Sequence, residues 1–249
     1  MISQSDIKRI CSLKNNKGRR EHNQFLIEGY RLVKTYLEGQ AEMVSVYYTK
    51  SFKQHHKSFI SLFKSLEYDP VLINEKLMSK ISDTVTPSGI IGICKTIKTP
   101  VPNFSAPSWL YLYRLSDPGN IGSLLRTAAW FNIRNIAFSP YSIDPFNPKV
   151  VRSAMGAHIH LEIHKNVDFE LFQQNNYLTL GADQHGKNVI DQFEPTHKWV
   201  IVLGGEVYGI QQDIKKKLNQ IFSVPRTGYG ESLNVAAAGA ILMSQLSKK

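Results

Sequence analysis

Cysteine is scarce in this sequence of 249 residues, which contains Cys11 and Cys94 and no Cys-x-x-Cys pair. Two thiols form neither a disulfide framework nor a four-cysteine zinc site, so disulfide-dense secreted scaffolds are excluded. A reducing, cytoplasmic compartment is expected. Long apolar runs are also missing: the most apolar stretch, 235–243, has nine residues, whereas a membrane-spanning helix needs about 20. We therefore expect no membrane partner and no secretory signal.

Acidic residues are outnumbered by basic ones, and the formal net charge is +10. Residues 1–100 hold 16 Lys and Arg against 9 Asp and Glu, whereas residues 101–249 hold 14 against 11. The first twenty residues alone contain six basic side chains and one acid. Such an excess favours a polyanionic partner, and we expect nucleic acid rather than a membrane surface.

A proline-rich break divides the chain. Three prolines lie within residues 96–107 and exclude a helix there. We place a linker at 96–107, between an N-terminal domain at 1–95 and a C-terminal domain at 108–249. Short strands and helices alternate in both domains, which predicts an α/β fold. The apolar run 199–203 predicts a strand buried on both faces of a parallel, doubly wound sheet.

The segment DPGNIGSLLRTAA follows an apolar strand at 109–113 and opens a helix. Asn120 stands about where an N-cap belongs, and Gly122 allows close approach of backbone or ligand. Arg126 lies four residues after Gly122, one turn along the same helix face. A guanidinium there can hold a phosphate bidentately. A capped helix with an exposed arginine is the alternative for this segment alone.

Two glycine-rich segments follow strands further along the chain. LGGEVYGI at 203–210 contains three glycines, whose backbone is not covered by side chains, at the end of a strand where open α/β sheets bind ligands. Glu206 is the single acidic residue of this segment. VPRTGYGESLNVAAAGA at 224–240 is a loop that enters an alanine-rich helix, with Ser232 and Asn234 at the helix start. A glycine turn and an ordinary capped helix are the alternatives for these two segments.

Two other patterns do not predict a site. Residues 181–188 nearly match the sequence motif of a phosphate-binding P-loop. The last position of that motif is a serine or threonine whose hydroxyl binds magnesium, and here it is Asn188. His158, His160 and His164 lack a supporting set of carboxylates, and spacing by itself is weak support for a metal site. We expect no metal ion in the functional site.

In this order and spacing, the three glycine-containing segments resemble the motifs of the SpoU (TrmH-type) ribose methyltransferases of the SPOUT class. NPKVVRSAMGA at 147–157 also fits that family. The stretch 7–34 looks like its substrate-binding domain, which resembles a small α/β ribosomal-protein fold. The resemblance thus covers nearly the whole chain and implies a C-terminal domain with a deep trefoil knot, an exception to the usual rules of chain topology. Arg226 and Ala236 depart from the family pattern, in positions that concern the subfamily rather than the reaction.

The resemblance implies S-adenosylmethionine as cofactor, held by Gly204, Val224 and Leu233, mostly through backbone. It also implies a homodimer with the active site at or near the interface. The reaction would be methyl transfer to a ribose 2′-hydroxyl of RNA, with ribosomal RNA favoured over tRNA. A tRNA ribose or base methyltransferase, or a non-catalytic RNA-binding scaffold, stays open as an alternative.

Five side chains carry the implied chemistry. Arg126 matches the family's catalytic arginine, and because a guanidinium stays protonated, we interpret it as a clamp for phosphate and developing alkoxide charge. A role for Arg126 as general base stays open. Ser232 and Asn234 would position the ribose. Asn120 would order the arginine and the first turn, and Glu206 would hold its loop.

Overall fold

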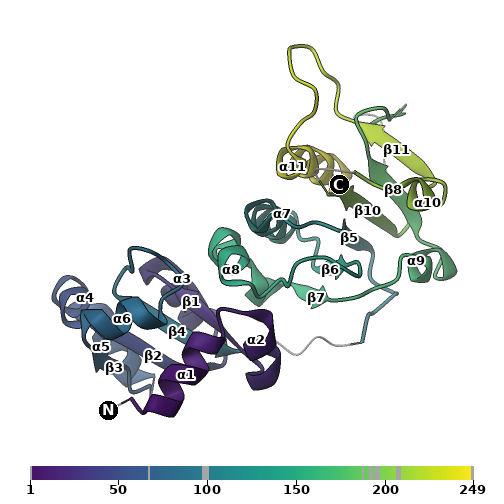
Figure 1. The fold of residues 1–249 in the computed structure, drawn as a ribbon. Helices are drawn as coiled ribbons and strands as arrows, with labels where there is room; N and C mark the ends of the chain where they lie inside the picture. The colour runs from purple at the N-terminus through teal and green to yellow at the C-terminus, as the bar shows by residue number, and fades with distance from the viewer. Residues whose placement is uncertain are drawn as a thin grey trace. The chain divides into compact units, whose positions relative to one another are not determined.

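The chain folds into two compact units, seen in the computed structural model (Figure 1). Unit 1 comprises Met1–Ile97 and Phe146–Ile159, and unit 2 comprises Lys98–Pro145 and His160–Lys249. The structure describes residues 2–66, 68–96, 101–186, 188–190, 193, 197–205 and 209–247. Unit 1 therefore includes a short segment of the region 108–249 that the sequence assigns to the second domain.

Unit 1 is a sheet with helices on its faces. Its strand order is β1-β4-β2-β3, in which β4 runs antiparallel to both neighbours and β2 pairs with β3 in parallel. Its elements, in chain order, are α1 (Gln4–Ser12), α2 (Asn16–His22), β1 (Gln24–Glu28), α3 (Tyr30–Glu38), β2 (Met43–Thr49), α4 (Lys50–His55), α5 (Lys57–Ser65), β3 (Val71–Ile73), α6 (Glu75–Ile81), β4 (Ile90–Lys95) and α8 (Pro148–Ala154).

The segment Phe146–Ile159 joins unit 1 because its apolar side chains complete that core. The Phe146 ring lies 5.0 Å from the Phe25 ring, and Val151 belongs to the same buried cluster. Arg152 forms an ion pair with Asp83 at 3.1 Å. A linear division of the chain at the prolines does not anticipate this packing, because contacts far apart in sequence decide it.

Unit 2 contains a parallel sheet, as the sequence predicts. The described strands follow the order β7-β6-β5-β10-β8-β11-β9, and each neighbouring pair is parallel. The elements are β5 (Ser108–Tyr113), α7 (Pro118–Trp130), β6 (Asn135–Phe138), β7 (Glu162–His164), α9 (Glu170–Gln174), β8 (Leu178–Ala182), β9 (Asn188–Val189), β10 (Trp199–Gly204), α10 (Gln212–Lys215), β11 (Gln220–Ser223) and α11 (Val235–Leu246). A 3-10 turn spans Ala157–His160 at the junction of the units.

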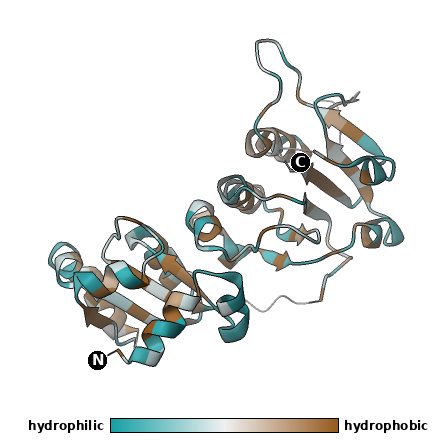
Figure 2. Ribbon diagram, viewed as in Figure 1, coloured by the Kyte–Doolittle hydropathy of each residue, from teal (hydrophilic) through white to brown (hydrophobic). Residues whose placement is uncertain are grey.

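The predicted apolar strand at 199–203 is β10, which lies inside the sheet between β5 and β8. Apolar colours run along β10 and over much of α11 in Figure 2. Trp199 through Leu203 are all buried. Across the described part of the chain, none of the helices combines the length and the apolar character that a bilayer crossing requires.

The winding of the unit 2 sheet reverses between β5 and β10. From β5 the chain proceeds to β6 and β7 on one side, while β10, β8 and β11 lie on the other. The last paired residues of the two adjacent strands are Tyr113 and Gly204. Carboxyl strand ends at such a reversal form the crevice in which open α/β sheets bind ligands. The topology therefore predicts a ligand-binding site at the carboxyl ends of β5 and β10.

Helix α11 packs closely on α7 and β10 (Figure 1). A Cβ built on Gly239 would lie 2.5 Å from Leu124 Cδ2 and 2.7 Å from Leu203 Cδ1. Both leucines are fully buried, so the helix approaches this closely only because position 239 has no side chain. The chain thus returns from β11 to cover the helix that carries the first motif.

Candidate active site

The first motif forms the start of α7. The helix begins at Pro118, and Asp117 caps it: the Asn120 backbone N–H donates to Asp117 Oδ1 at 2.7 Å. The prediction that Asn120 is the N-cap is therefore wrong by three residues. Proline is favoured directly after the cap, so the Asp-Pro pair was the signal that identifies Asp117.

Asn120 instead contacts the third motif. Asn234 is the N-cap of α11, where its Oδ1 accepts the backbone N–H of Ala236 at 2.9 Å. The Nδ2 group of Asn234 donates to Asn120 Oδ1 at 3.0 Å. An amide nitrogen has two N–H donors, so Asn234 keeps one beyond this bond. The structure thus brings two of the predicted site residues together at the starts of two packed helices.

Arg126 lies on the exposed side of α7, six residues after Asn120. Ser123 and Trp130 are also exposed and lie on the same side of the helix. Within the described part of the chain, no hydrogen bond or ion pair engages the Arg126 guanidinium. Its donors are therefore directed to solvent, where a polyanion can reach them.

The second motif is a tight glycine loop at the end of β10. The Gly205 backbone N–H donates to the Tyr113 carbonyl at 3.1 Å. A Cβ on Gly204 would lie 2.3 Å from the Gly209 carbonyl carbon, whereas a Cβ on Gly209 would meet open space. The two described ends of the loop therefore pair with each other at the sheet edge, where Gly204 and Gly205 present backbone without side chains. Glu206 lies outside the described residues.

The third motif is a loop between β11 and α11. Val224 is half-buried at the start of the loop, and Ser232 is exposed near its end. Leu233 is 50% exposed although it is apolar. The backbone groups of Gly204 and Gly205 and the exposed Leu233 suit a ligand that is part polar and part apolar, as the adenosyl group of S-adenosylmethionine is. The residues present therefore fit that cofactor.

Among the described residues, no group of three or more His, Cys, Asp or Glu is placed to hold a metal ion. His158 and His164 are buried. The His158 ring packs on Phe146 in unit 1, and the His164 ring packs on Trp109 in unit 2. Their side chains thus belong to the cores of different units.

A second polar group at this edge is not predicted by any motif. Arg114 follows β5 directly, and its Nη1 donates to Gln211 Oε1 at 2.7 Å. The Tyr113 hydroxyl donates to the same oxygen at 2.7 Å, and burial raises the pKa of that hydroxyl although Arg114 opposes the shift. The only local signal is an arginine placed immediately after an apolar strand.

The SpoU rRNA Methylase family matches residues 107–244, and the MRM3-like substrate binding domain matches residues 4–92. The 23S rRNA (guanosine(2553)-2′-O)-methyltransferase RlmP of Bacillus subtilis is 28% identical, over 94% of this chain and 92% of its own. An uncharacterized tRNA/rRNA methyltransferase of Synechocystis is 23% identical, over 98% of this chain and 90% of its own.

Solved structures show the same fold. A protein of the TrmH RNA methyltransferase family from Porphyromonas gingivalis has a TM-score of 0.82 and 28% identity, with 98% of both chains covered. The SpoU methyltransferase AviRb from Streptomyces viridochromogenes, in complex with AdoMet, has a TM-score of 0.84 and 19% identity, over 98% of this chain and 97% of its own. The family match covers more than half of the sequence, and the chain belongs to the SpoU family of RNA methyltransferases.

Proposed function

We propose that this protein transfers a methyl group from S-adenosylmethionine to a ribose 2′-hydroxyl of RNA, and that ribosomal RNA is its substrate. The observation that carries the proposal is the convergence of all three motifs at the carboxyl edge of β5 and β10, with the Asn120–Asn234 hydrogen bond joining the first motif to the third. A relative that matches nearly the whole chain is a ribosomal RNA 2′-O-methyltransferase by name.

The cofactor is held by Gly204, Val224 and Leu233. The bare backbone at Gly204 allows a ligand to approach the sheet edge closely, and Leu233 offers an exposed apolar surface at the end of the third loop. When bound, S-adenosylmethionine supplies a methyl group activated by its sulfonium charge. No metal is needed for this reaction, so cofactor binding measured by calorimetry should persist in EDTA; complete loss of binding in EDTA would contradict the proposal.

Arg126 acts on the RNA rather than on the cofactor. A ribose hydroxyl is a poor nucleophile until its proton is lost or polarised. The exposed guanidinium holds the neighbouring phosphate and stabilises negative charge on the 2′-oxygen. Ser232 and the free N–H of Asn234 orient the ribose, which makes the transfer effectively unimolecular. Glu206 holds the loop of the second motif.

Unit 1 binds RNA through backbone phosphates, but the first twenty residues supply fewer contacts than their charge suggests. Arg19 is only 4% exposed and donates to the Leu13 carbonyl at 2.9 Å. Arg9 is held by Asp6 at 3.1 Å and by Gln24. These two arginines stabilise α1 and α2, so neither is available to phosphate.

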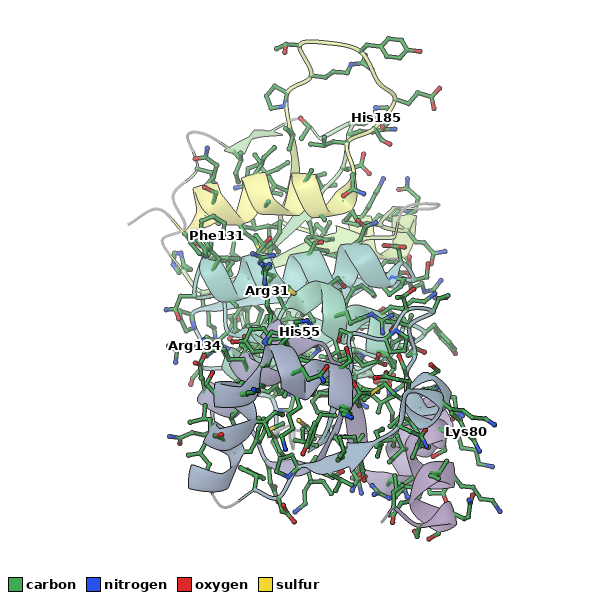
Figure 3. All side chains as sticks on the ribbon, turned by 90° about the vertical axis from the view of Figure 1, so that its left-hand side faces the viewer. Arg31, His55, Lys80, Phe131, Arg134 and His185 are labelled. Carbon is green, nitrogen blue, oxygen red and sulfur yellow. The ribbon has the colours of Figure 1, made fainter. Side chains whose placement is uncertain are left out.

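Helices α4 and α5 form a basic surface without acidic side chains. Residues 43–66 contain no acidic side chain, and Lys50, Lys53 and Lys57 are all exposed there. His55 at the end of α4 is also exposed and is labelled in Figure 3, where the exposed Lys80 of α6 lies at a separate part of unit 1. Without acids to oppose it, this surface attracts phosphates at several points along a strand.

The protein acts in the cytoplasm as a homodimer. Trp130 on α7 is 84% exposed and Ile241 on α11 is 39% exposed, and exposed apolar side chains on two packed helices support an interface on this side of unit 2. The return of the chain from β11 onto α7 supports a C-terminal trefoil knot, with α11 as its last element. The proposal extends to unit 1, whose four-stranded sheet with helices on its faces supports a fold like that of a small α/β ribosomal protein.

The decisive experiment maps methylated nucleotides across all stable RNAs, in cells with and without the gene. Loss of one 2′-O-methyl group in ribosomal RNA is the expected result. Loss of a tRNA ribose or base methyl group instead would assign the alternative substrate. An unchanged map together with intact cofactor and RNA binding would assign the scaffold role and overturn the proposal.

A further inference from the structure

Arg114 adopts a backbone conformation that arginine ordinarily avoids. It follows β5 directly and has φ of +51°, in the left-handed region that glycine enters at little cost. Its side chain is exposed, so burial of apolar atoms does not hold it there. A costly conformation kept at the edge where a sheet binds ligands points to a functional role.

Several contacts hold Arg114 in this conformation. Its backbone N–H donates to Ser139 Oγ at 2.9 Å, and its Nη1 donates to Gln211 Oε1 at 2.7 Å. Its guanidinium carbon lies 5.3 Å from the centroid of the Tyr113 ring and 5.8 Å from that of the Tyr141 ring, within cation–π range. The guanidinium is therefore fixed in direction, while one of its five N–H donors serves a described residue.

Tyr141 is the exposed ring of this group. Its side chain is 88% exposed, and its backbone also has positive φ, at +67°. An aromatic ring held in water beside a guanidinium gains nothing from apolar burial within the chain. Such a ring is a surface on which an unpaired base can stack.

Arg114 adjoins the glycine loop to which the proposed function assigns the cofactor, and the Tyr141 ring lies beside the Arg114 guanidinium. A Cβ on Gly205 would lie 2.8 Å from the Arg114 carbonyl oxygen, so the backbone at Arg114 touches the glycine loop. Gly205 follows Gly204, to which the proposed function assigns the cofactor. RNA that brings a ribose to this loop therefore passes close to Arg114 and Tyr141.

We propose that Arg114 and Tyr141 bind one nucleotide of the RNA adjacent to the nucleotide that is methylated. The inference rests on the proposed function, because it requires RNA in this crevice. Arg114 holds the phosphate of that nucleotide, Tyr141 stacks on its base, and Gln211 sets the direction of the guanidinium. Both are positioning residues, since neither touches the reacting atoms.

Arg114→Gly separates a role in RNA binding from a role in folding. Glycine adopts φ of +51° without strain, so this variant should unfold at the wild-type temperature or above it. Tyr141→Ala removes a ring that the fold does not bury, and its Tm should also match the wild type. Tyr141→Phe keeps the ring and serves as the matched control.

The binding probe is a short fluorescent oligouridylate, titrated at several salt concentrations with S-adenosylhomocysteine present. Arg114→Gly should reduce the slope of log affinity against log salt by about 0.7, the value for one phosphate contact with a single strand. Tyr141→Ala should weaken binding about tenfold without changing the slope, as loss of one stacked base predicts. Tyr141→Phe should bind like the wild type.

Kinetics supply an independent readout. With ribosomal RNA from cells that lack the gene, both Arg114→Gly and Tyr141→Ala should raise KM for RNA and leave kcat within about twofold. An unchanged slope and KM in Arg114→Gly, or equal losses in Tyr141→Phe and Tyr141→Ala, would overturn the inference. If the wild type methylates no RNA, the proposed function fails, and the oligouridylate titration still decides the nucleotide site.

Discussion

Asn234 donates a hydrogen bond from Nδ2 to Oδ1 of Asn120 at 3.0 Å, although 114 residues separate the two in sequence. Each also belongs to the first turn or the cap of a helix: Asn120 lies within α7, and Asn234 caps α11. One side-chain contact thus sets the starts of both helices relative to each other at the candidate active site.

Asn120→Ala and Asn234→Ala should therefore be coupled. Asn234→Ala should lower the free energy of unfolding by about 1 kcal/mol through loss of the cap, and Asn120→Ala by about 1 kcal/mol or less. The double variant should lose less than the sum, because both single changes remove the same hydrogen bond. Urea unfolding of the four proteins measures this coupling, and strict additivity would exclude it.

Replacement of Arg126 tests the chemistry. Arg126→Ala should abolish methyl transfer and leave cofactor affinity nearly intact, because Arg126 lies on α7 whereas the proposed cofactor contacts come from the second and third motifs. Calorimetry with S-adenosylmethionine is the control for folding. Wild-type transfer by this variant would remove Arg126 from the mechanism.

Arg126→Lys distinguishes a clamp from a base. Lysine keeps the charge but loses the planar fork that holds phosphate bidentately, so a clamp predicts low activity at every pH. A base predicts that activity rises steeply with pH, because lysine has a reference pKa of about 10.4. Single-turnover rates between about pH 7 and 10 decide the matter; strong alkaline rescue would overturn the clamp.

Gly239 should not tolerate a side chain. Gly239→Val should lower the free energy of unfolding by about 3 kcal/mol, because its methyl groups would overlap Leu124 and Leu203, both fully buried. Gly228→Val is the matched control: a Cβ there meets nothing within 4 Å, and a change within about 0.5 kcal/mol is expected. Equal unfolding midpoints in urea for the two variants would refute the close packing of α11.

The exposed apolar side chains of α7 and α11 should form the dimer interface. Trp130→Glu should convert the dimer into a monomer, because a charge would be buried without a partner. Val85→Glu is the control, since Val85 is fully exposed in unit 1 and should leave the mass unchanged. Light scattering at micromolar protein measures both. A wild-type monomer with full activity would argue decisively against a dimer.

The lysines of α4 and α5 should dominate the salt dependence of RNA binding by unit 1. A Lys50→Gln, Lys53→Gln, Lys57→Gln triple variant should reduce the slope of log affinity against log salt by about 2 to 3, at about 0.7–0.9 for each of the three lost phosphate contacts. The matching triple change to arginine keeps the charge and should keep the slope. An unchanged slope in the glutamine variant would place the RNA contacts elsewhere.

Charge substitution is a cleaner test of unit 1 than removal of residues 1–95. Phe146 and Val151 are buried in the core of unit 1, so a truncated chain would expose both. Exposed apolar surface of this kind favours aggregation, and a loss of RNA binding could not then be assigned to the missing charges.

The sequence by itself determined the features that depend on local chemistry. The apolar run at β10 predicted a buried parallel strand because such a strand has no polar face. The three glycine-containing motifs predicted the family, which the match over residues 107–244 confirms. The charge excess predicted an anionic partner, since it depends on composition alone.

Only the tertiary structure decided which side chains are available. Arg19 counts as a basic residue in the sequence, yet it is buried and bonded to the Leu13 carbonyl. Arg114 belongs to no motif, and only the structure shows its left-handed backbone and the two rings that lie beside its guanidinium. Burial and backbone strain depend on contacts between residues far apart in the chain. The local periodicity of apolar residues predicts helices and strands, but it does not predict those contacts.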